Sequence, residues 1–297
     1  MAPDILLVGA GGGLGSALTA TEWPEAVNLR ALSRAALDVT DASAVDAAIG
    51  SAKVIINAAA YTLVDAAESQ QEEAFAVNAE GPRVLARIAA ARGIPLLHVS
   101  TDYVFDGEAS APYTEEAPTN PLGVYGASKA LGEEHVRELA PNHLILRTSW
   151  VFGPHGNNFV RTMVRLMGER ESLSVVSDQL GCPTPTTELA RCIRDLAMRC
   201  LSADVPWGTF HLSGSPSTSW FDFAKAIAKA MQHHGAKAAT VQPISTAEYP
   251  TAARRPKSSV LDCSKAKGNL GLEIGPWAPA MHELVHQLLT EAGKIEA

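Results

Sequence analysis

Residues 5–15 read ILLVGAGGGLG, and this stretch decides the fold class. A short apolar run, 5–8, leads directly into three glycines spaced three residues apart, Gly9, Gly12 and Gly15. A buried strand, a turn without side chains and the start of a helix, in that order, let the phosphates of a dinucleotide approach the free N–H groups of a helix N-terminus. We therefore predict a nucleotide-binding unit at the start of the chain rather than a flexible glycine loop.

The rest of the first half alternates between strands and helices. Runs rich in Val, Ile and Leu without polar alternation predict buried parallel strands at 5–8, 27–32, 54–57, 96–100 and 144–147. Helices are predicted between them at 14–20, 44–48, 72–91 and 121–139. The last of these has Pro121 in its first turn and Asn120 as its cap. This alternation implies right-handed crossovers and a doubly wound α/β sheet of the Rossmann type.

The second half is less regular and predicts a smaller, discontinuous domain. Helices are predicted at 158–168, 187–201, 221–233 and 279–289, and strands at 173–176 and 209–213. We expect residues 1–150, with a return segment near 206–216, to form the nucleotide-binding domain. The remainder of 151–297 would form the substrate domain.

Composition restricts the class of partner. The chain has 297 residues, 46% of them hydrophobic, and a net charge of −8, which describes a globular protein. The acidic balance argues against nucleic acid as the main partner. The N-terminal stretch has no basic region, and no apolar run approaches the length that spans a membrane, so we expect no membrane partner and a cytoplasmic location. The four cysteines lack C-x-x-C spacing, which fits a reducing compartment.

The end of the second predicted strand bears on which nicotinamide cofactor binds. A site that prefers NAD usually has a carboxylate about 20 residues after the glycines, and here the strand ends Ser33-Arg34 instead. Arg34 can meet a 2′-phosphate, although a solvated surface arginine is the alternative. The sequence thus favours NADPH, with NADH still possible. Asp38, followed by Val39, could accept a hydrogen bond from the adenine amino group, or it could be a helix-capping aspartate before Asp41.

A tyrosine and a lysine with helical spacing suggest the chemistry. Tyr125 and Lys129 share one face of a predicted helix. An ammonium beside a phenol should lower the tyrosine pKa towards neutrality, so that the phenol can hand a proton to a carbonyl oxygen as hydride reaches the carbon. Ser100 or Thr101, at the carboxyl end of a strand, could hydrogen-bond the same oxygen. The pair alone could be a surface pair, but with the glycine turn and the hydroxyl it predicts a reductase.

Three small side chains at the end of the third strand, in 57–61 (NAAAY), leave room for a cofactor to lie across the sheet edge. The residues predicted to bind the cofactor are Gly9, Gly11, Gly12, Gly13, Leu14, Gly15, Ser33, Arg34, Asp38, Val39, Ala58, Ala59, Ala60, Tyr61, Tyr125 and Lys129.

Longer segments carry a family resemblance. They are NAAAYTLVDAAES (57–69), AFAVNAEGP (74–82), HVSTDYVFDG (98–107), PTNPLGVYGASKALGE (118–133), LRTSWVFGPHGNNFV (146–160), SDQLGCPT (177–184) and RRPKSSVLDCSK (254–265). Through them nearly the whole chain resembles the extended short-chain dehydrogenase/reductases and, among these, the dTDP-4-dehydrorhamnose reductase family.

The resemblance implies a role for each matching position. Thr101, Tyr125 and Lys129 match the catalytic residues of a reductase that acts on a dTDP-linked 4-keto-6-deoxyhexose and yields dTDP-L-rhamnose. Tyr125 would protonate the C4 ketone oxygen, and Lys129 would bind the nicotinamide ribose. The predicted substrate contacts are Thr101, Asp102, Tyr103, Trp150, Asn158 and Arg255. For Trp150 the alternative is a residue of the domain interface, for Asn158 a helix cap and for Arg255 a surface charge.

The resemblance also has departures. Some members bridge a dimer through Mg²⁺ held by glutamates, and the matching positions here carry Ala17 and Thr187. We therefore predict no such metal, and a monomer or weak homodimer. The family includes reductases of other nucleotide-linked 4-ketosugars and a non-catalytic NADP(H)-binding regulatory subunit, against which the intact Tyr125 and Lys129 pair argues.

A second motif, HELVH at 282–286, has the spacing of a zinc protease. In such a site Glu283 would be the base, and a third protein ligand would be needed. The residues that follow contain no histidine, and Met281, Leu284 and Val285 predict an ordinary amphipathic helix.

Overall fold

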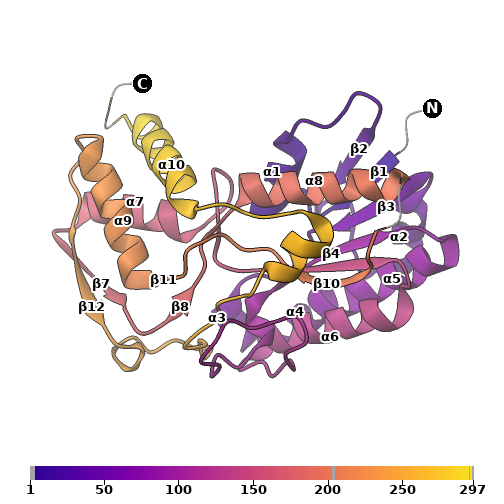
Figure 1. The fold of residues 1–297 in the computed structure, drawn as a ribbon, viewed down its shortest axis with the longest axis horizontal. Helices are drawn as coiled ribbons and strands as arrows, with labels where there is room; N and C mark the ends of the chain where they lie inside the picture. Colours follow the sequence, from indigo (N-terminus) through magenta and orange to yellow (C-terminus); the bar gives the residue numbers. More distant parts are fainter. Residues whose placement is uncertain (1–3, 203–204, 294, 296–297) are drawn as a thin grey trace.

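The computed structural model describes residues 4–202, 205–293 and 295. Its centre is a sheet of six parallel strands in the order β10-β5-β4-β3-β1-β2 (Figure 1). These strands are β1 (Asp4–Val8), β2 (Asn28–Leu32), β3 (Ala52–Asn57), β4 (Leu96–Thr101), β5 (His143–Thr148) and β10 (Gly208–His211). The chain runs outward from β1 to β2 and then returns to build the other half from β3, so the predicted doubly wound α/β fold is confirmed.

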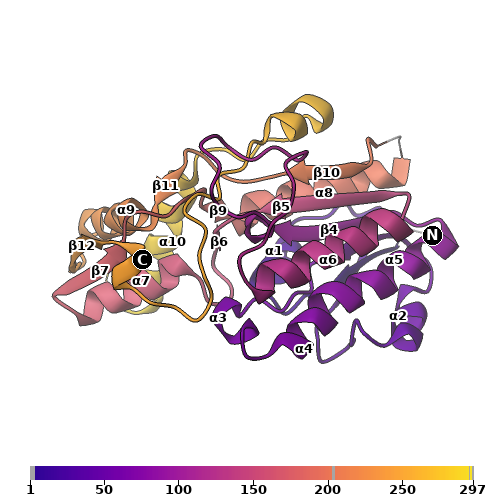
Figure 2. The ribbon, with the colours of Figure 1, turned by 90° about the horizontal axis from the view of Figure 1, so that it is seen from below.

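Helices cover both faces of this sheet. One face carries α1 (Gly13–Ala20) and α8 (Thr186–Ser202), and the other carries α2 (Ala42–Ile49), α5 (Gly81–Arg92) and α6 (Val124–Leu139). Alternate residues of one strand therefore enter different cores: Ile5 and Leu7 pack with α1 and α8, whereas Leu6 and Val8 pack with α2 and α5. Burial on both faces explains why these strands read as continuous apolar runs. Figure 2 shows α5 and α6 lying side by side.

A second hydrophobic cluster lies beside the main sheet (Figure 1). It is built by α7 (Phe159–Glu169), α9 (Trp220–His233) and α10 (Trp277–Glu291), together with the strand pair β7 (Ser172–Val176) and β12 (Thr240–Ile244). Although α8 follows residue 150, it packs on the main sheet, and β10 returns to pair with β5. The predicted division into two domains stays a prediction.

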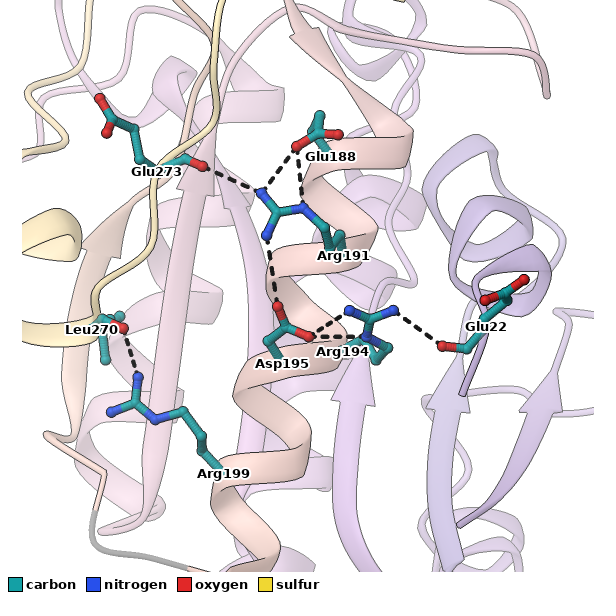
Figure 3. A network of polar contacts seen from close by, with 8 residues as sticks. All are labelled: Glu22, Glu188, Arg191, Arg194, Asp195, Arg199, Leu270 and Glu273. Carbon is teal, nitrogen blue, oxygen red and sulfur yellow. Dashed lines mark hydrogen bonds and ion pairs between the residues drawn. The ribbon is translucent and has the colours of Figure 1, made fainter. Parts of the chain in front are cut away.

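Arginines on α8 connect this helix to two other segments (Figure 3). Arg194 donates to the carbonyl of Glu22, in the loop after α1, at 3.1 Å. Arg199 donates to the carbonyl of Leu270 at 2.7 Å, and Arg191 donates to that of Glu273 at 3.4 Å. The bonds from Arg191 and Arg199 hold residues 270–273, which precede α10, against α8 and therefore against the main sheet.

Two predicted helices have different bounds in the structure. The helix predicted from Pro121 begins at Val124, after Gly123 in an extended conformation, so the prediction of Asn120 as its cap is wrong. The N–H of Val124 instead donates to Glu68 Oε1 at 2.8 Å, a partner far away in sequence. The helix predicted at 72–91 is divided into α4 (Gln71–Phe75), a π-helical turn η1 (Ala76–Glu80) and α5.

The remaining short elements were not predicted. They are α3 (Val64–Ala67), the 3₁₀ turns η2 (Asp102–Val104) and η3 (Thr246–Glu248), the π turn η4 (Ala266–Leu270) and strands β6 (Val151–Phe152), β8 (Leu180–Gly181), β9 (Thr184–Pro185) and β11 (Thr218–Ser219). Among the described residues, no helix has the length and apolar character needed to cross a membrane.

Gly132 tests how tightly α6 is packed. A Cβ at this position would overlap the backbone carbonyl of Asn78, which cannot swing away as a side chain could. Alanine favours a helix by about 1 kcal/mol over glycine, but overpacking costs about 1–3 kcal/mol. Because the overlap is with backbone, the upper end of this cost applies, and we expect Gly132→Ala to lower the free energy of unfolding in urea by about 2 kcal/mol. Gly268→Ala, whose Cβ would meet nothing within 4 Å, is the control and should cause no loss.

Candidate active site

A cavity of about 370 Å³ opens at the carboxyl ends of β1, β3, β4 and β5. The segment from β6 to the start of α7 and the first residue of α8 close its other side. Among the predicted site residues, those that line it are Gly12, Gly13, Leu14, Ala58, Ala60, Thr101, Asp102, Tyr103, Tyr125, Lys129, Trp150 and Asn158. The cavity therefore brings together groups predicted for the cofactor, the chemistry and the substrate.

The glycine turn places backbone N–H groups at the cavity. Gly9 has φ of +88° and lies against the backbone of Ala59, and Gly15 lies against the carbonyl of Gly9, so neither position has space for a Cβ. Gly12 precedes α1 and provides no side-chain cap. The first N–H groups of α1 are thus available to an anion, as a phosphate-binding turn requires.

Thr101, Tyr125 and Lys129 meet on the other side of the cavity. Thr101 ends β4, and its hydroxyl donates to Asp102 Oδ1 at 3.0 Å. Lys129 is 2% exposed and donates from Nζ to the carbonyl of Val99 at 2.7 Å. The Tyr125 ring packs edge-on against that of Tyr103, with 5.7 Å between the ring centroids.

Electrostatics at Tyr125 differ from the prediction. Burial raises the pKa of Tyr125 to about 12, although its contact with Thr101 lowers the pKa and nearby Asp102 raises it further. The predicted lowering towards neutrality is therefore wrong for this state of the protein. The physical reason is that the phenol is buried away from water. The ammonium of Lys129, which was expected to lower the tyrosine pKa, donates instead to the backbone carbonyl of Val99. Burial lowers the pKa of Lys129 to about 8.

Unpaired buried polar atoms gather at this cavity. Among the described residues, seven buried side-chain nitrogen or oxygen atoms have no hydrogen-bond partner, and four of them belong to cavity-lining side chains. These four are Ser100 Oγ, Asp102 Oδ2, Thr148 Oγ1 and Thr186 Oγ1. Such atoms are costly to bury unless a ligand or water completes them. Together with the free N–H groups of the glycine turn, they fit a polar ligand that carries phosphate.

The predicted substrate contacts are held in different ways. Trp150 has φ of +46° and stacks on Trp220, with the ring centroids 3.4 Å apart and the planes 5° apart. The indole therefore forms a fixed apolar wall that also joins the second hydrophobic cluster. Asn158 is the N-cap of α7 and accepts from the N–H of Arg161 at 3.1 Å, so its capping role is confirmed while its side chain still lines the cavity.

Arg255 lies near the cavity but not on its wall. It pairs with Asp65 at 2.7 Å, donates to the carbonyl of Ala253 at 3.1 Å, and has its guanidinium 6.0 Å from the ring centroid of Tyr103. Contact of Arg255 with a diphosphate stays a prediction.

The residues predicted around the adenosine lie beside the glycine turn. Ser33 follows β2 and approaches Gly11. Arg34 next to it is 80% exposed in its side chain and pairs with Glu73 at 2.7 Å. Asp38 accepts from the N–H and the hydroxyl of Thr40, whereas the N-cap of α2 is Asp41, so the helix-capping alternative for Asp38 is wrong.

Val39 and Tyr61 point into the protein. Val39 is buried in the core beneath α5, where it contacts the position of Gly81. Tyr61 is buried with Ala67 and Ala74, and its hydroxyl donates to Gln70 at 2.6 Å. Contact of either side chain with a cofactor stays a prediction.

Several lining residues were not predicted. Thr148 ends β5 as Thr101 ends β4, and Ser149 follows it, so the rule that ligands bind at the carboxyl ends of parallel strands could have found them. Thr62, His155, Asn157 and Thr186 also line the cavity. Thr186 comes from the start of α8, and only tertiary packing places it there.

The histidines of the HELVH segment face two others. The ring of His286 lies 4.8 Å from that of His234, and the ring of His282 lies 6.3 Å from that of His233, between centroids. In the described part of the chain, no group of three or more His, Cys, Asp or Glu side chains is placed to hold a metal ion. This face belongs to the packing of α9 on α10, remote from the cavity lining.

Comparisons with known proteins agree with this geometry. The family described as RmlD substrate binding domain matches residues 3–290. A dTDP-4-dehydrorhamnose reductase of Sinorhizobium fredii is 44% identical over 97% of this chain and 98% of that protein. The chain belongs to the dTDP-4-dehydrorhamnose reductase family.

Solved structures of this family share the fold. A dTDP-4-dehydrorhamnose reductase ortholog of Clostridium acetobutylicum has a TM-score of 0.89 and 36% identity, covering 96% of this chain and 99% of its own. The dTDP-4-dehydrorhamnose reductase of Bacillus anthracis, solved in complex with NADP, has a TM-score of 0.87 and 38% identity, covering 98% and 100%. The resemblance inferred from the motifs is thereby confirmed.

Asp102 gives the site a measurable pH signature. Burial raises the pKa of its carboxyl from 3.8 to about 6. The folded protein therefore holds this proton more tightly, and the resulting stabilisation is full below pH 4 and lost as pH rises through 6. Between pH 4 and pH 7 we expect the wild type to lose about 2–3 kcal/mol of unfolding free energy relative to Asp102→Asn, measured in urea. A difference between the two proteins that is the same at both pH values would contradict this assignment.

Proposed function

We propose that this protein reduces the C4 ketone of dTDP-4-dehydro-L-rhamnose to dTDP-L-rhamnose with NADPH. The observation that carries the proposal is the single cavity that joins the glycine turn of α1 to Thr101, Tyr125 and Lys129. Family membership supports the substrate, because relatives that match nearly the whole chain are named dTDP-4-dehydrorhamnose reductases.

NADPH is the cofactor that the residues fit best. The free N–H groups of α1 would hold the pyrophosphate, and Ser33 and Arg34 stand beside the turn where a 2′-phosphate would be recognised. The relative from Bacillus anthracis was solved with NADP. Arg34 would exchange its exposed partner Glu73 for the phosphate, at little cost because surface ion pairs contribute little.

In the proposed mechanism the protein supplies the proton and NADPH, when bound, supplies the hydride to C4. Tyr125 keeps its proton at neutral pH, since burial raises its pKa to about 12, and can donate it to the ketone oxygen. Lys129 provides a buried positive charge near the phenolate that remains. Thr101 lies beside Tyr125 and can turn its hydroxyl from Asp102 towards the same oxygen.

The substrate would lie between the strand ends and the second hydrophobic cluster. The fixed indole of Trp150 offers an apolar wall to the deoxysugar, and Asp102 and Tyr103 offer polar groups on the opposite side. Asn158 and Arg255 are proposed to approach the diphosphate, with Arg255 exchanging its exposed partner Asp65.

The alternatives are not favoured. A non-catalytic regulatory subunit does not need a tyrosine, a lysine and a threonine converging on one cavity. The relatives that match over most of the chain carry a reductase name. A monomer or weak homodimer remains part of the proposal.

A coupled assay tests the proposed reaction. The purified protein is given dTDP-4-keto-6-deoxyglucose together with a 3,5-epimerase that forms the L-configured ketosugar, and loss of reduced-nicotinamide absorbance is followed with NADPH and with NADH. We expect oxidation that requires both sugar and epimerase and is faster with NADPH. Absence of oxidation while NADPH still binds would reject this substrate.

Tyr125→Phe separates chemistry from binding in that assay. Without the phenolic proton, kcat should fall by about 10²–10⁴, the usual contribution of a positioned acid. The Kd for NADPH should stay within about fivefold, because at most one hydrogen bond is lost. Turnover close to that of the wild type would remove Tyr125 from the mechanism.

Arg34→Ala tests cofactor choice. Loss of a charged hydrogen bond to the 2′-phosphate should raise KM for NADPH by about tenfold or more, with KM for NADH little changed. Arg165→Ala, which removes another exposed arginine that pairs with a glutamate, Glu169 of α7, is the matched control. If Arg34→Ala changed KM for NADPH and KM for NADH equally, Arg34 would be a surface arginine with no role in the choice of cofactor.

A further inference from the structure

A buried ion pair lies one helical turn beyond Lys129. Glu133 of α6 is 0% exposed and receives two hydrogen bonds from Arg147 of β5, from Nε at 2.9 Å and from Nη2 at 2.6 Å. Arg147 is 2% exposed. Both carboxylate oxygens thus meet one guanidinium in parallel, which is the strongest geometry for such a pair.

Arg147 is itself held on its remaining sides. Its guanidinium carbon lies 4.9 Å from the ring centroid of Phe105, and Nη1 lies 3.4 Å from Nε2 of His211 in β10. Burial and Arg147 lower the pKa of His211 to about 4, so the imidazole is neutral. Its Nδ1 faces the carbonyl of Tyr113 at 3.1 Å and can donate to it, which leaves Nε2 free to accept from Arg147.

A contribution to stability does not by itself explain why this ion pair is buried here. Desolvating two charges costs about as much as their attraction returns, so an apolar pair of similar volume is often equally stable. The position of the pair suggests a different role. Glu133 and Lys129 are four residues apart on one face of α6, and Arg147 is followed directly by Thr148, Ser149 and Trp150 of the cavity wall.

We propose that Glu133 is a positioning residue for Lys129: its carboxylate keeps the buried ammonium charged and directed at the cavity, and Arg147 holds that carboxylate in place. Without Glu133, two cations, Lys129 and Arg147, would be buried near one another without an anion between α6 and β5. The ammonium is the group that the proposed function requires beside Tyr125, and in this respect the inference rests on that function.

The charges near Lys129 determine whether a substitution raises or lowers the Lys129 pKa. Burial lowers the pKa of Lys129 to about 8, and Glu133 opposes this by raising it. For Glu133 burial raises the pKa, but Arg147 and the other hydrogen-bond donors to the carboxylate, Arg137 among them, together lower it by more, so the carboxyl stays ionised. Glu133 acts on Lys129, and Lys129 in turn acts on His98 of β4. The other titratable and charged groups considered on the elements around Lys129 are Tyr125 and Arg137 of α6, Asp102 after β4, Arg147 of β5 and His211 of β10.

Most of these neighbours do not oppose the proposed role of Glu133. His98 is neutral, because burial and Lys129 hold its pKa well below the usual range. Tyr125 is neutral below its pKa of about 12. Asp102 is a second anion, which remains in every variant considered below. Arg137 also donates to Glu133, at 3.0 Å, but its side chain is 39% exposed and its charge is screened by water.

The experiment measures the titration of Lys129 directly. The full chain is labelled with [ε-¹³C]lysine, the Lys129 signal is assigned from its absence in Lys129→Met, and its midpoint is followed by NMR. Removing the anion in Glu133→Gln should lower the midpoint by about one pH unit. Removing the cation in Arg147→Gln should shift it in the opposite direction. The double variant, which removes both charges, should lie close to the wild type.

Arg137→Gln is the matched control, because it removes the exposed partner of Glu133 and leaves the buried pair intact. It should leave the Lys129 midpoint unchanged. The alkaline limb of kcat/KM for NADPH-dependent reduction should follow the same order, moving to lower pH only in Glu133→Gln. If the pair were purely structural, Glu133→Gln, Arg147→Gln and the double variant would all lower activity and stability, and the Lys129 midpoint would not shift in opposite directions in the two single variants.

The outcomes separate this inference from the proposed reaction. Should Glu133→Gln fail to fold, the opposite shift in Arg147→Gln and its cancellation in the double variant decide the matter. A Lys129 midpoint that does not move in the folded variants of an active enzyme overturns the positioning role alone. Reversed shifts in a protein that does not oxidise NADPH would leave the role of Glu133 intact and reject the proposed function.

Discussion

Parallel pairing of neighbouring strands is the constraint on which the site depends. Because β1, β3, β4 and β5 run in the same direction, their carboxyl ends meet along one edge of the sheet. The glycine turn follows β1 and Ala58 follows β3, while Thr101 and Thr148 are the last residues of β4 and β5, so all of them line one cavity. The point where the chain reverses its progress across the sheet, between β1 and β3, is where such folds leave room for a ligand.

The walls of this cavity combine groups that are costly to leave unpaired. Hydroxyls of Ser100, Thr148 and Thr186 are buried without a partner, and the carboxyl of Asp102 is only half satisfied. A protein that only needed to fold would gain by pairing or removing them. Their gathering at one place indicates that a ligand completes them, and the same desolvation changes the pKa values of Asp102, Tyr125 and Lys129.

The helix α6, which carries Tyr125 and Lys129, is held by polar contacts from distant parts of the chain. Glu68 caps its first turn, the carbonyl of Val99 accepts from Lys129, and Arg147 pairs with Glu133 one turn later. Gly126 and Gly132 let the helix approach the backbone of Tyr103 and Asn78 more closely than any residue with a Cβ could. The position of Tyr125 and Lys129 is therefore set from both ends of α6 and from the sheet beneath it.

The sequence by itself determined the α/β class, the parallel strands, the nucleotide-binding turn and the helical spacing of Tyr125 and Lys129, because these depend on local spacing and on apolar runs that few folds can bury; it left Ser100 and Thr101 as alternatives until the family resemblance selected Thr101. It also led to the family through motifs spread along the chain. It could not place the start of α6 after Pro121, since the cap comes from Glu68, or show that Val39 and Tyr61 point into the core.

Only the tertiary structure decided the direction of the Tyr125 pKa, the stacking of Trp150 on Trp220, the arrival of Thr186 at the cavity and the pairing of Glu133 with Arg147. Each depends on which groups distant in sequence become neighbours and on how much water is excluded between them. Neither the distant neighbours of a residue nor its exclusion from water can be determined from the spacing of residues along the chain.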